Sequence, residues 1–144
     1  MSTKYVVACD GSAASERALS FAIECAGLHG ASIVIAHVLE WSPYSFLTPE
    51  ELAERHKRRG EELERAKTAV ADPLAKQVAD QGLAVDTVIR YGHVAETLCQ
   101  IATETGASQL VIGRTGDSGL ATRVFGSVAG TLAQIAPVPC TIVP

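Results

Sequence analysis

Five short segments rich in apolar residues recur along the chain, and each has the length of a β-strand. They cover residues 5–9, 32–39, 84–91, 109–112 and 138–143. The first two runs are almost continuously apolar instead of alternating, which is typical of strands buried on both faces of a parallel sheet. We therefore expect a sheet that is covered on both sides.

Segments with helical periodicity separate these strands. Ser12 is predicted to cap the first helix, and Thr48 and Glu51 form a capping box at the start of the second. Pro73 lies inside that second segment and is expected to kink or split it. The helices are expected at about 13–28, 49–81, 94–105 and 128–135.

Strand and helix alternate over the whole chain, which predicts an α/β fold. Right-handed crossovers place helices on both faces of a parallel sheet, so residues 1–144 are expected to form a single Rossmann-like domain with five parallel strands. In such folds ligands bind beyond the carboxyl ends of the strands, where the strand order reverses. Asp10, Val38 and the residues after Ile112 all follow strand ends.

Composition and charge narrow the classes of function. The 144 residues are 47% hydrophobic with a net charge of −4, so a nucleic-acid partner is not expected. The basic run at 55–59 is interleaved with glutamates, which favours a solvated helix face with i,i+4 ion pairs.

No apolar run reaches the length of a membrane span, and the N-terminus lacks the layout of a signal peptide, so a cytoplasmic location is expected. The four cysteines form no CxxC motif and are expected to be reduced and buried.

A spaced set of glycines follows the fourth strand. Gly113, Gly116 and Gly126-Ser127 give the pattern G-x2-G-x9-G-S, and a helix is predicted to start directly after them at Val128. Glycines allow a close approach of backbone to ligand, and the N–H groups of a helix start attract anions. The pattern is neither a P-loop nor GxGxxG. Without a P-loop lysine, phosphate charge has to be met by backbone N–H groups, the helix dipole and a metal ion.

Two motifs in this order resemble the universal stress protein family. The first is Val7 to Ser15, which resembles the opening strand and DGSxxS turn of that family, and the second is the glycine set. The glycine pattern matches the signature of the ATP-binding branch. The resemblance covers nearly the whole chain and implies an adenine nucleotide alpha hydrolase-like fold, with ATP and Mg²⁺ as ligands.

The resemblance assigns the nucleoside end of ATP to Asp10 and Val38. Asp10 would contact the ribose or the adenine edge, and Val38 would offer backbone groups to the adenine ring. The alternatives are that Asp10 only fixes the turn before the first helix and that Val38 is only a core residue.

The resemblance assigns the ribose and phosphates to the glycine set. Gly113 and Gly116 would let the loop wrap the ligand, and Gly126, Ser127 and Val128 would donate N–H groups to the phosphates. Ser127 would add its hydroxyl, and Mg²⁺ would bridge the phosphates. The alternatives are loop punctuation for Gly126 and a simple helix cap for Ser127.

Asp117 departs from the resemblance, because the family often has a basic or neutral residue beside the second glycine, and a carboxylate there repels a triphosphate unless a metal ion intervenes or the side chain points to solvent. Arg114 and Arg123 would offset this charge by reaching the phosphates, and surface positions without a ligand role are the alternative for all three. Of the histidines, His37 is expected to be a hydrogen-bonded core residue. His93, beside the end of the third strand, is expected to be structural, with ligand contact as the alternative.

Three functions remain open from the sequence. The resemblance favours an ATP-binding regulatory protein that dimerises through its C-terminal strand, because the apolar edge at 139–143 tends to pair with another edge. A nucleotide-free interaction module and a slow ATPase are the alternatives. The HxGH and SGGxDS signatures of related enzymes are absent, and no nucleophile–base pair is evident. The segment 41–48 is expected to be a loop, with a lid and a partner surface as its two alternative roles.

Overall fold

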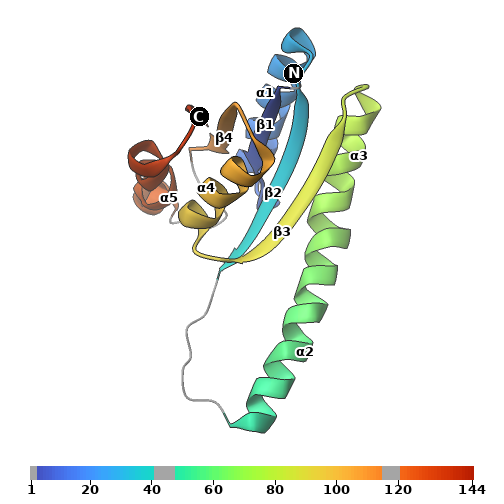
Figure 1. Cartoon of the computed structure of the whole chain (residues 1–144), viewed down its shortest axis with the longest axis vertical. Helices are drawn as coiled ribbons and strands as arrows, with labels where there is room; N and C mark the ends of the chain where they lie inside the picture. The colour runs from blue at the N-terminus through green and yellow to red at the C-terminus, as the bar shows by residue number, and fades with distance from the viewer. Residues whose placement is uncertain (1–2, 41–47, 115–120) are drawn as a thin grey trace.

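A computed structural model describes residues 3–40, 48–114 and 121–144, without the side chains of residues 121–127. Strands and helices alternate as expected, and the strands form one parallel sheet in the order β3-β2-β1-β4-β5 (Figure 1). The elements are β1 (Lys4–Ala8), α1 (Ala13–His29), β2 (Ser32–Glu40), α2 (Pro49–Ala66), a π-helical stretch η1 (Lys67–Ala71), α3 (Asp72–Asp80), β3 (Val85–Gly92), α4 (Val94–Thr105), β4 (Gln109–Gly113), α5 (Ala121–Ile135) and β5 (Cys140–Val143). The predicted five-stranded α/β fold is confirmed.

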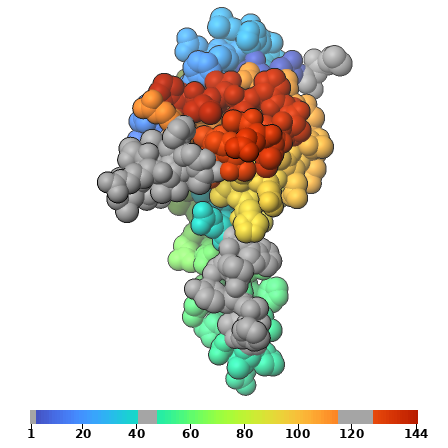
Figure 2. All heavy atoms as spheres, turned by 90° about the vertical axis from the view of Figure 1, so that its left-hand side faces the viewer, coloured from blue at the N-terminus to red at the C-terminus, as the bar shows by residue number. Residues whose placement is uncertain are grey.

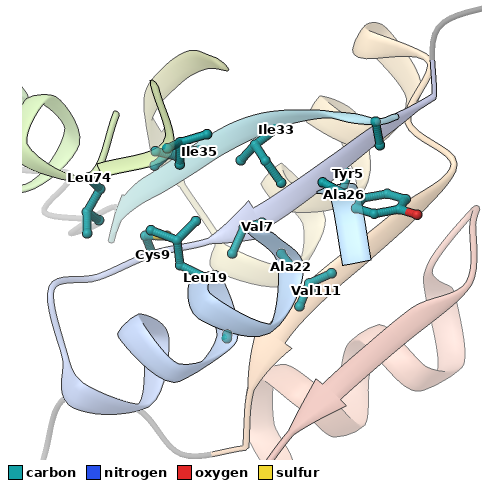
Figure 3. Close-up of a cluster of buried hydrophobic side chains, with 13 residues drawn as sticks. Tyr5, Val7, Cys9, Leu19, Ala22, Ala26, Ile33, Ile35, Leu74 and Val111 are labelled. Carbon is teal, nitrogen blue, oxygen red and sulfur yellow. The ribbon is translucent and has the colours of Figure 1, made fainter. Parts of the chain in front are cut away.

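Two apolar clusters cover the two faces of the sheet. On one face α1 and α3 pack on the strands, with Leu19, Ile35 and Leu74 in the cluster that Figure 3 shows. On the other face α4 and α5 contribute Leu98 and Leu132. Successive strand residues point to opposite faces, so an interior strand such as β2 has to be apolar at nearly every position.

Local signals at the helix ends are confirmed. The Ser12 side chain accepts a hydrogen bond from the Ser15 N–H at 3.1 Å, and the Thr48 side chain accepts one from the Glu51 N–H at 3.2 Å. Gly30 and Gly106 end α1 and α4 in the left-handed conformation, with φ of 66° and 68°. Each cap satisfies backbone groups that a helix end leaves unpaired.

The long second helical segment is split, as Pro73 predicted, but the break precedes the proline. The π-helical stretch η1 separates α2 from α3, and Pro73 lies in the first turn of α3. Proline is tolerated in a first turn because it has no N–H to donate. In a continuous helix its ring would crowd the preceding turn, and the wider π-helical stretch accommodates it.

The helix α2 projects past the carboxyl edge of the sheet (Figures 1 and 2). Ala66 is the buried residue of α2, and an exposed i,i+4 pair joins Arg58 to Glu54 at 3.8 Å. The charged run is therefore a solvated helix face, as expected. Within the described ranges, no helix is both long and apolar enough to cross a membrane.

Two sequence-based expectations are wrong. The helix α5 begins at Ala121 and not after Ser127, so Gly126 and Ser127 lie inside it. A single glycine costs a helix only about 1 kcal/mol relative to alanine, so Gly126 does not have to end one. The cysteines are free thiols, but Cys9 alone among the four is buried and the other three are half-buried.

Candidate functional site

The strand order reverses between β1 and β4. The chain continues from β1 to β2 and β3 on one side, and β4 and β5 complete the sheet on the other. α1 follows β1 on one face and α5 follows β4 on the opposite face, so the two connections diverge at the carboxyl ends of these neighbouring strands. This divergence creates the place where open α/β sheets bind ligands. The structure brings Asp10, Val38, Gly113 and Arg114 to this edge of the sheet.

A tight turn after β1 presents Asp10. The Oδ1 atom of Asp10 accepts a hydrogen bond from the Ser12 N–H at 2.9 Å, and Gly11 has the left-handed φ of 84°. The Ser15 hydroxyl donates to the Ser12 carbonyl at 2.9 Å and braces the turn from the helix side. Asp10 thus fixes the turn, and its carboxylate is exposed at the carboxyl end of β1.

The backbone of Val38 faces the region beyond the end of β1. The Cys9 N–H donates to the Ala36 carbonyl at 2.9 Å, so Ala36 directs its backbone groups toward β1. Backbone direction alternates along a strand, so the N–H and C=O of Val38 face the same side. β1 ends at Ala8, opposite Ala36, and Val38 lies two residues farther on. The Val38 side chain packs on the α4/α5 cluster, so its core role and its open backbone coexist.

Gly113 has a packing role that the sequence did not reveal. A Cβ at Gly113 would lie 2.8 Å from the Ala14 carbonyl oxygen, because the end of β4 runs close against the first turn of α1. A glycine that ends a strand is a signal for such an approach, but which helix approaches is a tertiary fact. Arg114 follows, exposed, and its N–H donates to the Val143 carbonyl at 2.8 Å.

Of the remaining predicted phosphate contacts, residues 126–128 lie within α5 and Gly116 is not among the residues that the structure describes. Gly116, together with Asp117, lies outside the described residues, and so does the side chain of Arg123. Gly126 and Ser127 are inside α5, which begins five residues before Gly126. Val128 is half-buried and packs against the α4/α5 cluster.

Two buried side chains lie near this edge: His37, which is hydrogen-bonded, and Cys9, whose pKa favours the protonated thiol. His37 is 7% exposed, and its Nδ1 lies 2.6 Å from the Cys9 carbonyl oxygen, which confirms the expected hydrogen-bonded core histidine. Burial, followed by the negative charge of Asp10, raises the pKa of the Cys9 thiol to about 12. Since the thiolate is the nucleophilic form, this raised pKa disfavours Cys9 as a nucleophile at neutral pH.

His93 precedes α4 and is exposed, and its side chain makes no capping hydrogen bond. In the described parts of the chain, no three histidine, cysteine, aspartate or glutamate side chains converge on a metal position.

A polar cluster at the end of β3 was not predicted from the sequence. The Arg59 guanidinium lies 4.5 Å from the centre of the Tyr91 ring, and the Tyr91 hydroxyl donates to the Glu62 carboxylate. Desolvation, followed by the hydrogen bond and the charge of Glu62, raises the pKa of Tyr91 to about 12. The i,i+3 spacing of Arg59 and Glu62 puts both on one face of α2, but nothing in the sequence pairs that face with Tyr91.

Comparisons with known proteins agree on one family. A model of the universal stress protein family matches residues 1–144. The universal stress protein YxiE of Bacillus subtilis (strain 168) is 30% identical over 99% of this chain and 99% of its own length. A universal stress protein of Mycolicibacterium smegmatis is 34% identical over 96% of this chain, which spans 47% of that relative.

Solved structures share the fold over nearly the whole chain. Universal stress protein UspA from Lactobacillus plantarum superposes with a TM-score of 0.84 at 24% identity, covering 99% of this chain and 97% of that one. The universal stress protein from Archaeoglobus fulgidus in complex with dAMP has a TM-score of 0.64 at 21% identity, with 100% and 98% covered. A universal stress protein family protein from Arabidopsis thaliana with AMP bound has a TM-score of 0.65 at 18% identity, with 98% and 90% covered.

Proposed function

The chain belongs to the universal stress protein family, and on that premise we propose that it is a regulatory protein that binds ATP with Mg²⁺ and acts as a homodimer in the cytoplasm. The observation that carries the proposal is that the open backbone of Val38 and the exposed side chain of Asp10 lie at the same carboxyl edge of the sheet, where the strand order reverses. Structures of relatives described with AMP and with dAMP support an adenine nucleotide as the ligand.

The nucleoside end of the site has suitable hydrogen-bonding chemistry. An N–H and a C=O on the same residue, Val38, complement the N1 acceptor and the N6 donor of adenine. The Asp10 carboxylate is an acceptor for ribose hydroxyls, and its bond to the Ser12 N–H holds it in place. A carboxylate offers about four acceptor positions, so this bond leaves capacity for a ligand.

The phosphate end of the proposed site consists of backbone N–H groups and Arg114. Gly113, Gly116 and residues 126–128 would surround the phosphates. Because α5 begins at Ala121, binding at Ser127 would require the residues before it to leave the helix. Mg²⁺ keeps several waters and is commonly held through substrate phosphates, so it would reach this chain through the nucleotide and supply charge neutralisation there.

Titration calorimetry with AMP, ADP and ATP, each with and without Mg²⁺, tests the proposal. We expect ATP to bind, and Gly126→Val to abolish binding while the circular dichroism spectrum and melting temperature stay unchanged. Gly130→Val is the matched control. Gly130 lies on the same helix as Gly126, and a Cβ at Gly130 would meet no atom of another part of the chain within 4 Å. A wild-type protein that binds none of these nucleotides would contradict the proposed function and favour an interaction module.

A further inference from the structure

The hydrogen-bond ladder between β1 and β2 stops one step early. The Cys9 N–H donates to the Ala36 carbonyl, and in a regular parallel ladder the next bond would run from the Val38 N–H to the Cys9 carbonyl. Among the backbone hydrogen bonds of these described residues, none joins Val38 to Cys9. The early stop is what leaves the backbone of Val38 open.

A side chain bonds the Cys9 carbonyl instead. The Cys9 carbonyl accepts from His37 Nδ1 at 2.6 Å. A carbonyl oxygen can only accept, so Nδ1 carries a hydrogen and His37 is the donor. His37 is 7% exposed, so its imidazole is packed within the protein. The chain after Cys9 then enters the Asp10–Ser12 turn instead of continuing alongside β2.

We propose that His37 is a positioning residue for base selection: by holding the Cys9 carbonyl, it leaves the N–H and C=O of Val38 available to select a 6-aminopurine over a 6-oxopurine. This inference rests on the proposed nucleotide binding. Hypoxanthine presents an N1–H donor and an O6 acceptor where adenine presents an acceptor and a donor. A 6-oxopurine therefore leaves both Val38 groups opposite groups of the same kind, which is a strong basis for rejection in a partly desolvated site.

Two variants separate this role from simple packing. The amide nitrogen of asparagine lies two bonds from Cβ, as Nδ1 of histidine does, whereas that of glutamine lies three bonds away, as Nε2 does. His37→Asn should therefore keep the preference for AMP over IMP within about threefold of wild type. His37→Gln should reduce that preference about tenfold or more, the size expected for one hydrogen bond.

The ratio of the AMP and IMP dissociation constants is the informative measurement. Loss of packing alone would weaken both nucleotides equally and leave the ratio unchanged, and that result would overturn the inference. A wild-type protein that binds AMP but shows no preference over IMP would also overturn it. If wild type binds neither nucleotide, the proposed function fails, and a separate measurement still decides the role of His37.

That measurement is amide hydrogen exchange in the wild-type protein without nucleotide. The Val38 amide should exchange at least about tenfold faster than the Ala36 amide, which lies within the β1–β2 ladder. Added AMP should slow exchange at Val38. A Val38 amide protected as well as that of Ala36 before any nucleotide is added would show that the ladder bond exists, and would overturn the inference without any variant.

Discussion

At the scale of single residues, the carboxyl edge of the sheet depends on a few close contacts. Asp10 and Gly11 form a turn that depends on the Asp10 carboxylate, which accepts the Ser12 N–H, and on the positive φ of Gly11. Gly113 allows β4 to end against the first turn of α1, with no room for a methyl group. His37 holds the carbonyl that precedes the turn. These contacts join β1, β2, β4 and α1 at one point.

Gly113→Ala should lower the free energy of unfolding by about 1–3 kcal/mol, because the added Cβ would overlap the Ala14 carbonyl and the strand or helix would have to shift. Gly27→Ala is the matched control. Gly27 lies within α1 with no atom within 4 Å of the added Cβ, so this change should raise stability by about 0.5–1 kcal/mol. Urea denaturation of both variants checks the pair. Equal free energies of unfolding for Gly113→Ala and wild type would show that β4 and α1 can move apart without loss of stability.

At the scale of elements, α2 is attached to the sheet at one end. Its last residue, Ala66, is buried, and Arg59 and Glu62 contact Tyr91 at the end of β3. The helical turns before Arg59 extend past the sheet and carry many charged residues (Figure 1). The cluster around Tyr91 is therefore the attachment that sets the direction of α2.

The pKa of Tyr91 reports this attachment. It is raised from 10 to about 12, so the folded state favours the neutral phenol, and that contribution is complete below pH 10 and lost as the pH rises toward 12. The 295 nm difference between wild type and Tyr91→Phe should show little phenolate below pH 11. Glu62→Gln should shift the titration toward lower pH, whereas Glu61→Gln, one residue away, should not. Ionisation of Tyr91 near pH 10 in wild type would mean that α2 is not attached there.

At the scale of the whole molecule, β5 is an edge strand, as its apolar sequence predicted. The carbonyls of Pro139 and Val143 accept hydrogen bonds from Leu110 and Arg114, so the odd-numbered residues face β4. By alternation, Ile142 directs its N–H and C=O to the open edge, and its side chain is 37% exposed. An open apolar edge of this kind is suited to pairing with a second copy.

Ile142→Pro should shift the proposed homodimer to monomer, because proline removes the outward N–H without removing a hydrogen bond to β4. Ile142→Val keeps the N–H and should remain dimeric. Sedimentation velocity at micromolar concentration distinguishes the two, with circular dichroism as the check that the sheet persists. A wild-type monomer at this concentration would refute dimerisation, and a dimeric Ile142→Pro would place the interface elsewhere.

Much of the fold was predictable because its signals are local. Apolar runs and a serine or threonine before a helix each act within a few residues, and the caps at Ser12 and Thr48 both lie where they were expected. The predicted start of α5 at Val128 was wrong because a glycine that is typical of a loop is also tolerated within a helix.

The sequence by itself determined the strand and helix order, the two-sided burial of the sheet and the family to which the chain belongs, since periodicity and motif spacing are properties of neighbouring residues. Only the tertiary structure decided which groups meet across the fold. The contact of Gly113 with Ala14, the bond from His37 to Cys9 and the Tyr91 cluster join segments that lie far apart in the chain or on different elements. Such contacts depend on strand register and helix placement, which arise when the whole core packs at once.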